Sequence, residues 1–162
     1  ILGDKFSFDI EFNQDPNNGK EWLFGKFCYW INGTSLGDYE LGTSLRDVLF
    51  QMRGVVADCG NREADWCKCG AKDIYDLLDG AIYNDAECDV DMPARYDISI
   101  SVDVFDGIKI YLIDCVNSDS RIIYSIDDGI TVIDTRIASG KFDSIVNSCY
   151  TELNKIYEES IR

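Results

Sequence analysis

The sequence predicts an α+β protein with a mainly antiparallel sheet of about seven strands. Segments of alternating apolar and polar residues are joined by short turns, and short connections between strands require antiparallel pairing. Three other segments repeat their apolar residues with the period of amphipathic helices, and such helices must cover a face of the sheet. We expect the order three strands, two helices, four strands, one helix, in a single domain over residues 1–162.

The first part of the chain is predicted to form strands. Residues 5–12 alternate, and turn residues follow at 15–19. The segment 21–31 is apolar and aromatic on both faces, which is typical of a central strand. Asn32-Gly33 supplies the positive φ angles of a tight hairpin leading into a short strand at 34–40. The inward face of the first strand would carry Phe6, Phe8, Ile10 and Phe12.

Three helices are predicted from apolar periodicity. The first follows a possible N-cap at Thr43 and ends near Gly60. Because Gly54 within it is unfavourable for a helix, we expect another element to pack closely there. The second helix covers 71–83, and the last begins near Ser139 or Gly140. The buried stripe of the first would consist of Leu45, Val48, Leu49, Met52, Val55 and Val56, and that of the last of Phe142, Ile145, Val146, Cys149, Leu153, Ile156 and Tyr157.

Four more strands are predicted between the second and third helices. Residues 84–93 form a loop or an extended segment, after which 95–104 alternate as a strand. The segment 108–116 is apolar on both faces and is predicted to be central. Two further strands, 121–126 and 130–136, would be joined by a tight hairpin at Asp128-Gly129.

The net charge of −15 arises from thirty acidic and fifteen basic residues and is unevenly distributed. Residues 73–134 contain fifteen acids and three bases, so they carry −12 of the total. Such a field repels nucleic acid and anionic membranes and speeds the encounter with basic partners. Acidity for solubility alone is the plainer interpretation. No apolar run is long enough to span a bilayer and the first residues do not resemble a signal peptide, so we expect a cytoplasmic protein.

The seven cysteines are an odd number without an extracellular spacing pattern, which predicts free thiols in a reducing cytosol. Cys28, Cys115 and Cys149 fall in apolar periodic segments and are expected in the core. A four-thiolate zinc site is an alternative for the rest, although their spacing lacks the paired knuckles of structural zinc sites. These remaining thiols are Cys59, Cys67, Cys69 and Cys88.

Catalytic motifs are scarce in the sequence. The absence of histidine excludes Ser-His, Cys-His and His-metal mechanisms. No glycine-rich phosphate loop opens a helix, and the acidic segments do not fit a calcium-binding loop. A small carboxylate-dependent hydrolase stays as an alternative, because its two carboxylates are defined by spatial separation rather than by sequence. We expect no enzyme activity, no cofactor and no metal.

Residues 85–91 hold an acid at every second position: Asp85, Glu87, Asp89 and Asp91. An extended backbone would direct these carboxylates to one side, at a spacing of about 6.5–7 Å. Such a row could mimic a phosphate backbone for a partner that handles nucleic acid. The alternative is a solvated, mobile acidic loop.

Several stretches together resemble the immunity protein 42 family. They are residues 21–31, 36–51, 59–62 and 102–107, with a weaker similarity at 140–146. The sequence departs from the family at 64–92, where the cysteines and the acidic row lie. The resemblance implies an α+β immunity protein of a bacterial polymorphic toxin or contact-dependent growth inhibition system. Such a protein binds one cognate toxin domain in the cytoplasm of the producing cell and blocks it without catalysis.

Toxins of this kind are often nucleases and therefore basic, so an acidic inhibitor would be drawn to one. We expect the partner to be the C-terminal domain of the toxin and favour a monomeric inhibitor. Alternatively, residues 36–47 are a structural joint bent by Gly37 and Gly42, with Asp47 paired to a neighbouring arginine. The residues predicted to contact the toxin are Asp38, Tyr39, Glu40, Asp85, Glu87, Asp89 and Asp91.

Overall fold

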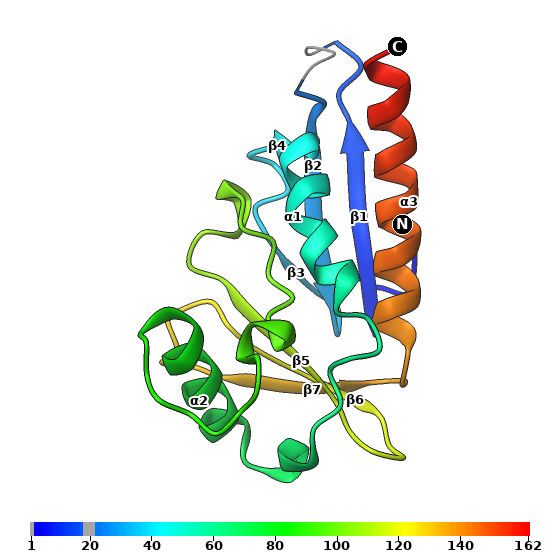
Figure 1. Ribbon diagram of the computed structural model, residues 1–162. Helices are drawn as coiled ribbons and strands as arrows, with labels where there is room; N and C mark the ends of the chain where they lie inside the picture. The colour runs from blue at the N-terminus through cyan, green and yellow to red at the C-terminus, as the bar shows by residue number, and fades with distance from the viewer. Residues whose placement is uncertain (1, 18–21) are drawn as a thin grey trace. The chain divides into compact units, whose positions relative to one another are not determined.

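The computed structural model describes residues 2–17 and 22–162, which contain seven strands and three α-helices (Figure 1). The predicted α+β class with antiparallel pairing is confirmed. The predicted turn at 15–19 and the start of the predicted strand at 21–31 lie partly outside the described residues. Chain contacts divide the protein into two compact units, which are described separately. Unit 1 comprises residues 1–57, 100–106 and 141–162, and unit 2 comprises residues 58–99 and 107–140.

The sheet of unit 1 is built around β2, which confirms the central strand predicted there. β1 pairs with one edge of β2, while β3 and β4 share its other edge. Asn32 and Gly33 form the predicted hairpin turn with φ angles of 48° and 80°. The strands are β1 (Phe8–Gln14), β2 (Phe24–Ile31), β3 (Thr34–Leu36) and β4 (Thr43–Ser44).

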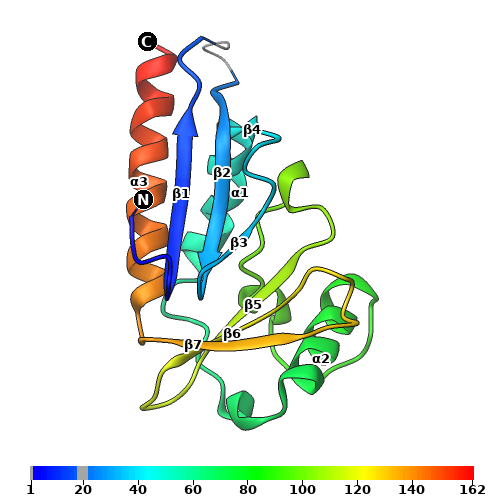
Figure 2. The same ribbon diagram turned by 180° about the vertical axis from the view of Figure 1, so that it is seen from behind.

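Two helices cover one face of this sheet. α1 (Leu45–Ala57) packs on β2, α3 (Lys141–Ser160) packs on β1, and the helices contact each other. In Figure 2, β1 and β2 lie in front of α1, so α1 covers the face of the sheet that is turned away from the viewer. The expected close packing at Gly54 is wrong, because no described residue outside the adjacent turns of the helix places an atom within 4 Å of a Cβ built there. The aromatic core of unit 1 includes Phe8, Phe27, Tyr29, Phe105 and Phe142, whereas Phe6 is exposed.

The sheet of unit 2 has the order β5-β6-β7. The strands are β5 (Lys109–Asp114), β6 (Ser120–Ser125) and β7 (Ile133–Ile137), and α2 (Ala71–Tyr83) has the predicted bounds. The prediction that 108–116 is central is wrong, because β6 is the central strand. The outer edge of β5 forms isolated bridges with Glu63 and Asp97. β5 is apolar on both faces because its successive residues 110–113, which alternate between the faces, are all buried. The hairpin at Asp128-Gly129 is a longer loop than predicted.

The strand predicted over 95–104 does not form, although its alternation of buried residues is correct. Met92 has a φ of 46° and Pro93 begins a 3-10 helix (Pro93–Tyr96). The hydroxyl of Ser99 accepts the N–H of Ile110 at 2.8 Å, and the N–H of Ser99 is bound by Asp97. These side-chain hydrogen bonds replace the backbone ladder that a strand needs. A second 3-10 helix (Asp103–Phe105) follows in unit 1.

The core of unit 2 lies between its sheet and α2 and contains a disulfide. Cys67, in a third 3-10 helix (Asp65–Lys68), is bonded to Cys115 just after β5, with 5.6 Å between the Cα atoms. The prediction of free thiols is therefore wrong for these two residues, which the fold brings together across 48 positions. The prediction that Cys28 and Cys149 are buried thiols is confirmed. The core residues include Ile74, Tyr75, Leu78, Tyr96, Tyr111, Ile113 and Ile123.

Candidate functional site

The predicted contact residues 38–40 lie in unit 1, on the connection between β3 and β4. Asp38 and Glu40 are exposed and Tyr39 is half-buried. The N–H of Asp38 donates to the carbonyl of Val104 at 2.9 Å, and the carboxylate of Asp38 accepts the N–H of Leu41 at 3.1 Å. This connection is thus held by one backbone hydrogen bond and one hydrogen bond to a side chain.

Lys26 on β2 links Tyr39 and Glu40. The Nζ atom of Lys26 lies 2.6 Å from Oε2 of Glu40 and 5.4 Å from the centre of the Tyr39 ring. The hydrogen bond with Glu40 raises the pKa of Lys26, and burial raises the pKa of the Tyr39 hydroxyl. At neutral pH the lysine is therefore cationic and the tyrosine neutral.

The alternative of a structural joint at 36–47 has specific support in the backbone. Gly37 and Gly42 have φ angles of 103° and 75°, which favour glycine. A Cβ at Gly37 would lie 3.1 Å from the ring of Phe105. Asp47 lies 3.5 Å from Nε of Arg46, as that alternative expects. The segment therefore serves the fold of unit 1, whether or not it also contacts a partner.

The acidic row at 85–91 lies in unit 2, in the irregular segment that follows α2. All four acidic side chains are exposed, whereas Cys88 and Val90 between them are half-buried. Val90 packs on the core of unit 2, so the row from 87 to 91 retains the alternation that the sequence predicts. A φ of 51° at Asp85 turns the backbone out of the extended region and separates that residue from the regular row.

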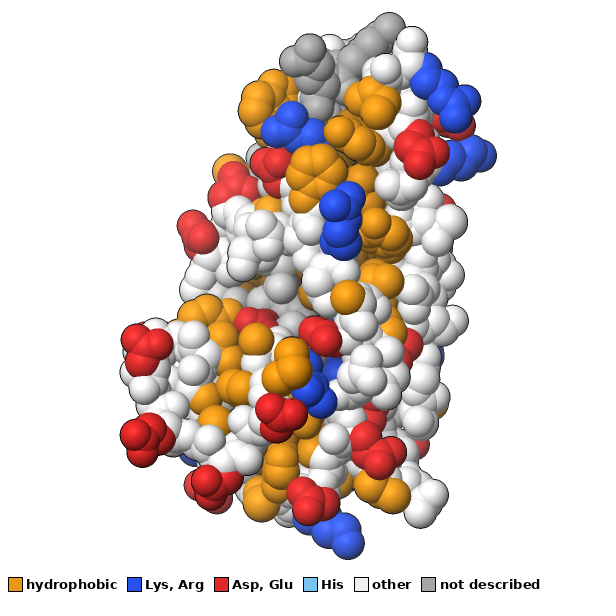
Figure 3. Space-filling view, viewed as in Figure 1, with side chains coloured by type: hydrophobic (Ala, Val, Ile, Leu, Met, Phe, Trp, Pro, Cys, Tyr) orange, Lys and Arg blue, Asp and Glu red, His pale blue; other side chains and the backbone are white. Residues whose placement is uncertain are grey.

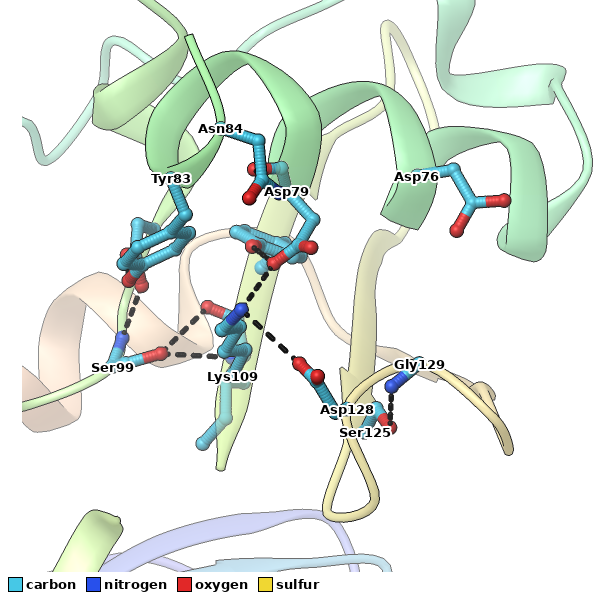
Figure 4. Close-up of polar contacts among 12 residues, drawn as sticks. Asp76, Asp79, Tyr83, Asn84, Ser99, Lys109, Ser125, Asp128 and Gly129 are labelled. Atoms are coloured by element: carbon cyan, nitrogen blue, oxygen red, sulfur yellow. Dashed lines mark hydrogen bonds and ion pairs between the residues drawn. The ribbon is translucent and has the colours of Figure 1, made fainter. Parts of the chain in front are cut away.

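A second group of polar side chains lies beside α2 and was not predicted. Figure 4 shows Lys109 of β5 between Asp79 of α2 and Asp128 of the β6–β7 loop. Its Nζ atom is 2.7 Å from Asp79 and 3.5 Å from Asp128. The hydroxyl of Tyr83 donates to Asp97, and that of Tyr111 donates to Asp79 at 3.3 Å. Lys109 is one of only three bases among the acidic residues 73–134. Its position there is the sequence feature that could have indicated a lysine paired with several carboxylates.

The protonation states of this group favour a structural role. Burial raises the pKa of the Tyr111 and Tyr83 hydroxyls, and nearby carboxylates raise them further. Burial alone would lower the pKa of Lys109, but the hydrogen bond and charge of Asp79 raise it on balance. Both tyrosines are therefore neutral and Lys109 is charged at neutral pH, so none of the three titrates near the pH at which a general acid or base works best.

Carboxylates dominate the surface of both units. Unit 1 has fourteen acidic and eight basic residues and unit 2 has sixteen and seven, giving net charges of −6 and −9. Figure 3 shows acidic side chains scattered among hydrophobic ones around α2. In the part of the chain that the structure describes, no cluster of three or more Cys, Asp or Glu residues could hold a metal ion. Within the same residues, no helix has the length and apolar content of a membrane span.

The fold and surface thus define an acidic α+β protein with two small antiparallel sheets and a carboxylate-rich exterior. The immunity protein 42 family matches residues 1–152, so the chain belongs to this family of immunity proteins. This confirms the resemblance noted in the sequence. The crystal structure of CdiI from Burkholderia dolosa AUO158 has a similar fold, with a TM-score of 0.75 and 16% identity over 93% of this chain and 98% of that chain. No curated protein sequence matches significantly.

Proposed function

We propose that this chain binds the C-terminal toxin domain of a contact-dependent growth inhibition system and neutralises it by direct contact. Membership of the immunity protein 42 family supports this, as does the fold that it shares with CdiI. The observation that carries the proposal further is the charge: acidic residues outnumber basic ones by two to one, and both units are negative. Such a surface selects a basic partner and speeds the encounter with it.

The partner that fits this charge best is a nuclease domain. Enzymes that bind nucleic acid carry lysine and arginine to contact phosphates, and the same surface attracts an acidic inhibitor. Inhibition takes place in the cytoplasm, where the toxin would otherwise act, and requires no catalysis by the inhibitor. A steered association can reach ~10^8–10^9 M⁻¹s⁻¹ at low salt, which suits an inhibitor that must act before the toxin does.

Of the two predicted contact segments, the row at 85–91 is the more available. Asp85, Glu87 and Asp89 are exposed side chains of an irregular segment. Asp91 lies 3.7 Å from Arg95, and Glu40 in the other segment is paired with Lys26. Exposed pairs of this kind contribute only about 0–1 kcal/mol, so a partner's cation can replace the internal one. Each segment stays a proposed toxin contact on its own unit, and 85–91 is the acidic centre proposed for unit 2.

The proposal is tested with the toxin domain encoded beside this gene. Co-expression should rescue cells from that domain, and the purified proteins should bind with an affinity that falls as salt rises. Titration of the toxin activity should reach its end point at one molar equivalent, because a binding inhibitor is stoichiometric whereas an enzyme that inactivates the toxin is not. Failure of the two wild-type proteins to bind would overturn the proposal.

Matched variants separate a local acidic contact from general attraction. The triple variant Asp85→Asn, Glu87→Gln, Asp89→Asn removes three charges from the proposed centre. The control carries Glu152→Gln, Glu158→Gln and Glu159→Gln, which remove three charges from exposed positions of α3. We expect the first variant to lose at least tenfold in affinity and the second to change mainly the association rate at low salt. Equal losses in both would contradict the role of 85–91.

A further inference from the structure

The loop that joins β6 to β7, residues 126–132, presents large apolar side chains to solvent. Ile130 is 85% exposed and Ile126 is 60% exposed, while Ile133 at the start of β7 is 40% exposed. Single exposed apolar residues are common on protein surfaces. Two exposed isoleucines within one short connection and a third at the first residue of the next strand are less common, and grouped apolar exposure of this kind marks interaction surfaces.

The backbone of this loop is fixed from inside. The hydroxyl of Ser125 accepts the N–H of Gly129 at 2.8 Å and donates to the Asp127 carboxylate at 2.8 Å. The same carboxylate accepts the N–H of Thr131 at 2.8 Å. The loop is therefore already ordered before a partner arrives. An ordered loop loses little conformational entropy on binding, which favours affinity.

Two further contacts hold the loop against the body of unit 2. Gly129 is buried with a φ of 84°, and a Cβ built on it would lie 2.8 Å from the ring of Tyr75 in α2. Val132 is half-buried against the core of unit 2. With Gly129 and Val132 turned inward, the exposed side chain of Ile130 lies between two anchored positions.

The surroundings of the exposed isoleucines are acidic. Asp127 and Asp128 lie in the loop itself, and the Asp128 side chain is 85% exposed even though Lys109 approaches it to 3.5 Å. Lys109 also pairs with Asp79, as Figure 4 shows, so two carboxylates share one cation. Hydrogen bonds from Thr131 and Ser125 lower the pKa of Asp127, which keeps its charge in place. An apolar tip with negative neighbours fits an apolar socket edged by basic groups.

We propose that the β6–β7 loop is the apolar anchor of the toxin contact, with Ile130 inserted into a socket of the toxin domain and Asp128 facing its basic edge. This rests on the proposed function and adds a contact that neither acidic segment supplies. A second copy of this chain fits the loop poorly, because each unit is net negative and the carboxylates of two copies would repel. Apolar side chains seated in sockets dominate the free energy of many interfaces, and charges mainly set their orientation and rate.

The experiment compares two isoleucine truncations in full-length protein. Ile130→Ala shortens the proposed anchor, and Ile161→Ala shortens an isoleucine that is 62% exposed near the C-terminus. Each variant is titrated calorimetrically against a catalytically inactive toxin domain encoded beside the gene. We expect Ile130→Ala to raise Kd at least tenfold and Ile161→Ala to leave it within twofold. Because both side chains are exposed, the circular dichroism spectrum and melting temperature should stay at the wild-type values.

The possible outcomes separate this inference from the proposed function. If wild-type protein binds the toxin domain and Ile130→Ala binds equally well, the anchor is disproved while the immunity function stands. If wild-type protein does not bind, both proposals fall. Hydrogen exchange gives a second readout: amides of 126–132 should be slowed by the toxin domain, and unchanged exchange there would also disprove the anchor.

Discussion

Arg121 on β6 and Asp134 on β7 form a bidentate ion pair, with Nη2–Oδ2 and Nε–Oδ1 distances of 2.7 and 3.2 Å. The remaining amino group of Arg121 donates to the carbonyls of Cys67 and Cys69. Arg121 is buried, whereas Asp134 retains partial exposure. One guanidinium therefore ties the edge strand β7 and the segment around the disulfide to the central strand of unit 2.

Replacing Arg121 with methionine should lower the free energy of unfolding by about 2–4 kcal/mol. The variant leaves the Asp134 carboxylate and two backbone carbonyls without their donor, and loss of one partner of a buried pair typically costs about 3–5 kcal/mol. We place the loss somewhat lower because Asp134 is partly exposed to water. Urea unfolding followed by circular dichroism measures the change.

Arg136 provides the control for that variant. It lies directly opposite Arg121 in the β6–β7 register, but its side chain is exposed. Arg136→Met should change the stability by no more than about 0.5 kcal/mol. A loss as large as that of Arg121→Met would mean that removal of a positive charge from this acidic unit, rather than the buried pair, is responsible.

The sequence predicted those elements whose periodicity reflects their packing. α2 has its predicted bounds, and the buried stripe predicted for α3 is confirmed at Phe142 through Leu153. The strand predicted over 95–104 does not form, and the reason is local. Ile98 and Ile100 are buried as an alternating strand requires, yet Ser99 and Asp97 bind the backbone with their side chains. Periodicity reports burial, and it does not report such competing hydrogen bonds.

The candidate site was only partly predictable. Exposure of the acids at 85–91 followed from composition, but the left-handed backbone at Asp85 had no sequence signal. Asp128-Gly129 is a common turn pair, and it therefore predicts a tight hairpin between β6 and β7. In the structure, β6 ends at Ser125 and β7 begins only at Ile133, and the side chain of Ile130 in the loop between them is exposed to solvent. Which apolar residue of a loop faces solvent depends on tertiary contacts such as Gly129 with Tyr75, which no local pattern contains.

Gly54→Ala should stabilise the protein by about 0.5–1 kcal/mol. The glycine lies inside α1, and apart from the backbone of its own helix a Cβ at this position meets no atom of the described residues within 4 Å. Alanine has the higher helix propensity and adds no clash. Thermal unfolding should show a melting temperature raised by about 1–4 °C. A lowered melting temperature would contradict this prediction, because it would mean that the added Cβ causes a clash or strain at this position.

Thiol labelling should distinguish three classes of cysteine. In native, unreduced protein, iodoacetamide should modify Cys69 first and then Cys59 and Cys88, because Cys69 is exposed and the other two are partly so. Burial raises the pKa of Cys28 to about 12 and also raises that of Cys149, so both should react only after unfolding.

The disulfide defines the third class. Cys67 and Cys115 should be protected until a reductant is added, and peptide mass spectrometry of unreduced protein should find the two linked. The closed loop is long, so reduction should lower stability by about 2–4 kcal/mol. Rapid labelling of both residues in oxidised protein would show that the bond does not form in solution.

Asp127 should make the stability of the protein sensitive to acid. Hydrogen bonds from Thr131 and Ser125 lower its pKa in the folded state below the ordinary value of 3.8. The folded state then binds fewer protons than the unfolded state, so this contribution is full above pH 3.8 and is lost as the pH falls through the folded pKa. Asp127→Asn keeps an oxygen acceptor but cannot titrate. Its urea midpoint should therefore decline less than that of the wild type between pH 4 and about pH 2, and parallel declines would contradict the assignment.

The two units should unfold in a single cooperative transition, as one domain. The chain passes between them four times, so neither is a continuous segment. If unit 2 unfolded alone, unit 1 would have to close two disordered loops, and each closure costs about 3 kcal/mol in entropy.

Tryptophan fluorescence can report on each unit separately. Trp66→Phe leaves only Trp22 and Trp30, which lie in unit 1, and the variant with Trp22→Phe and Trp30→Phe leaves only Trp66, which lies in unit 2. In each variant, the urea midpoint from fluorescence should coincide with the midpoint from circular dichroism. Separate midpoints would show that the units unfold independently.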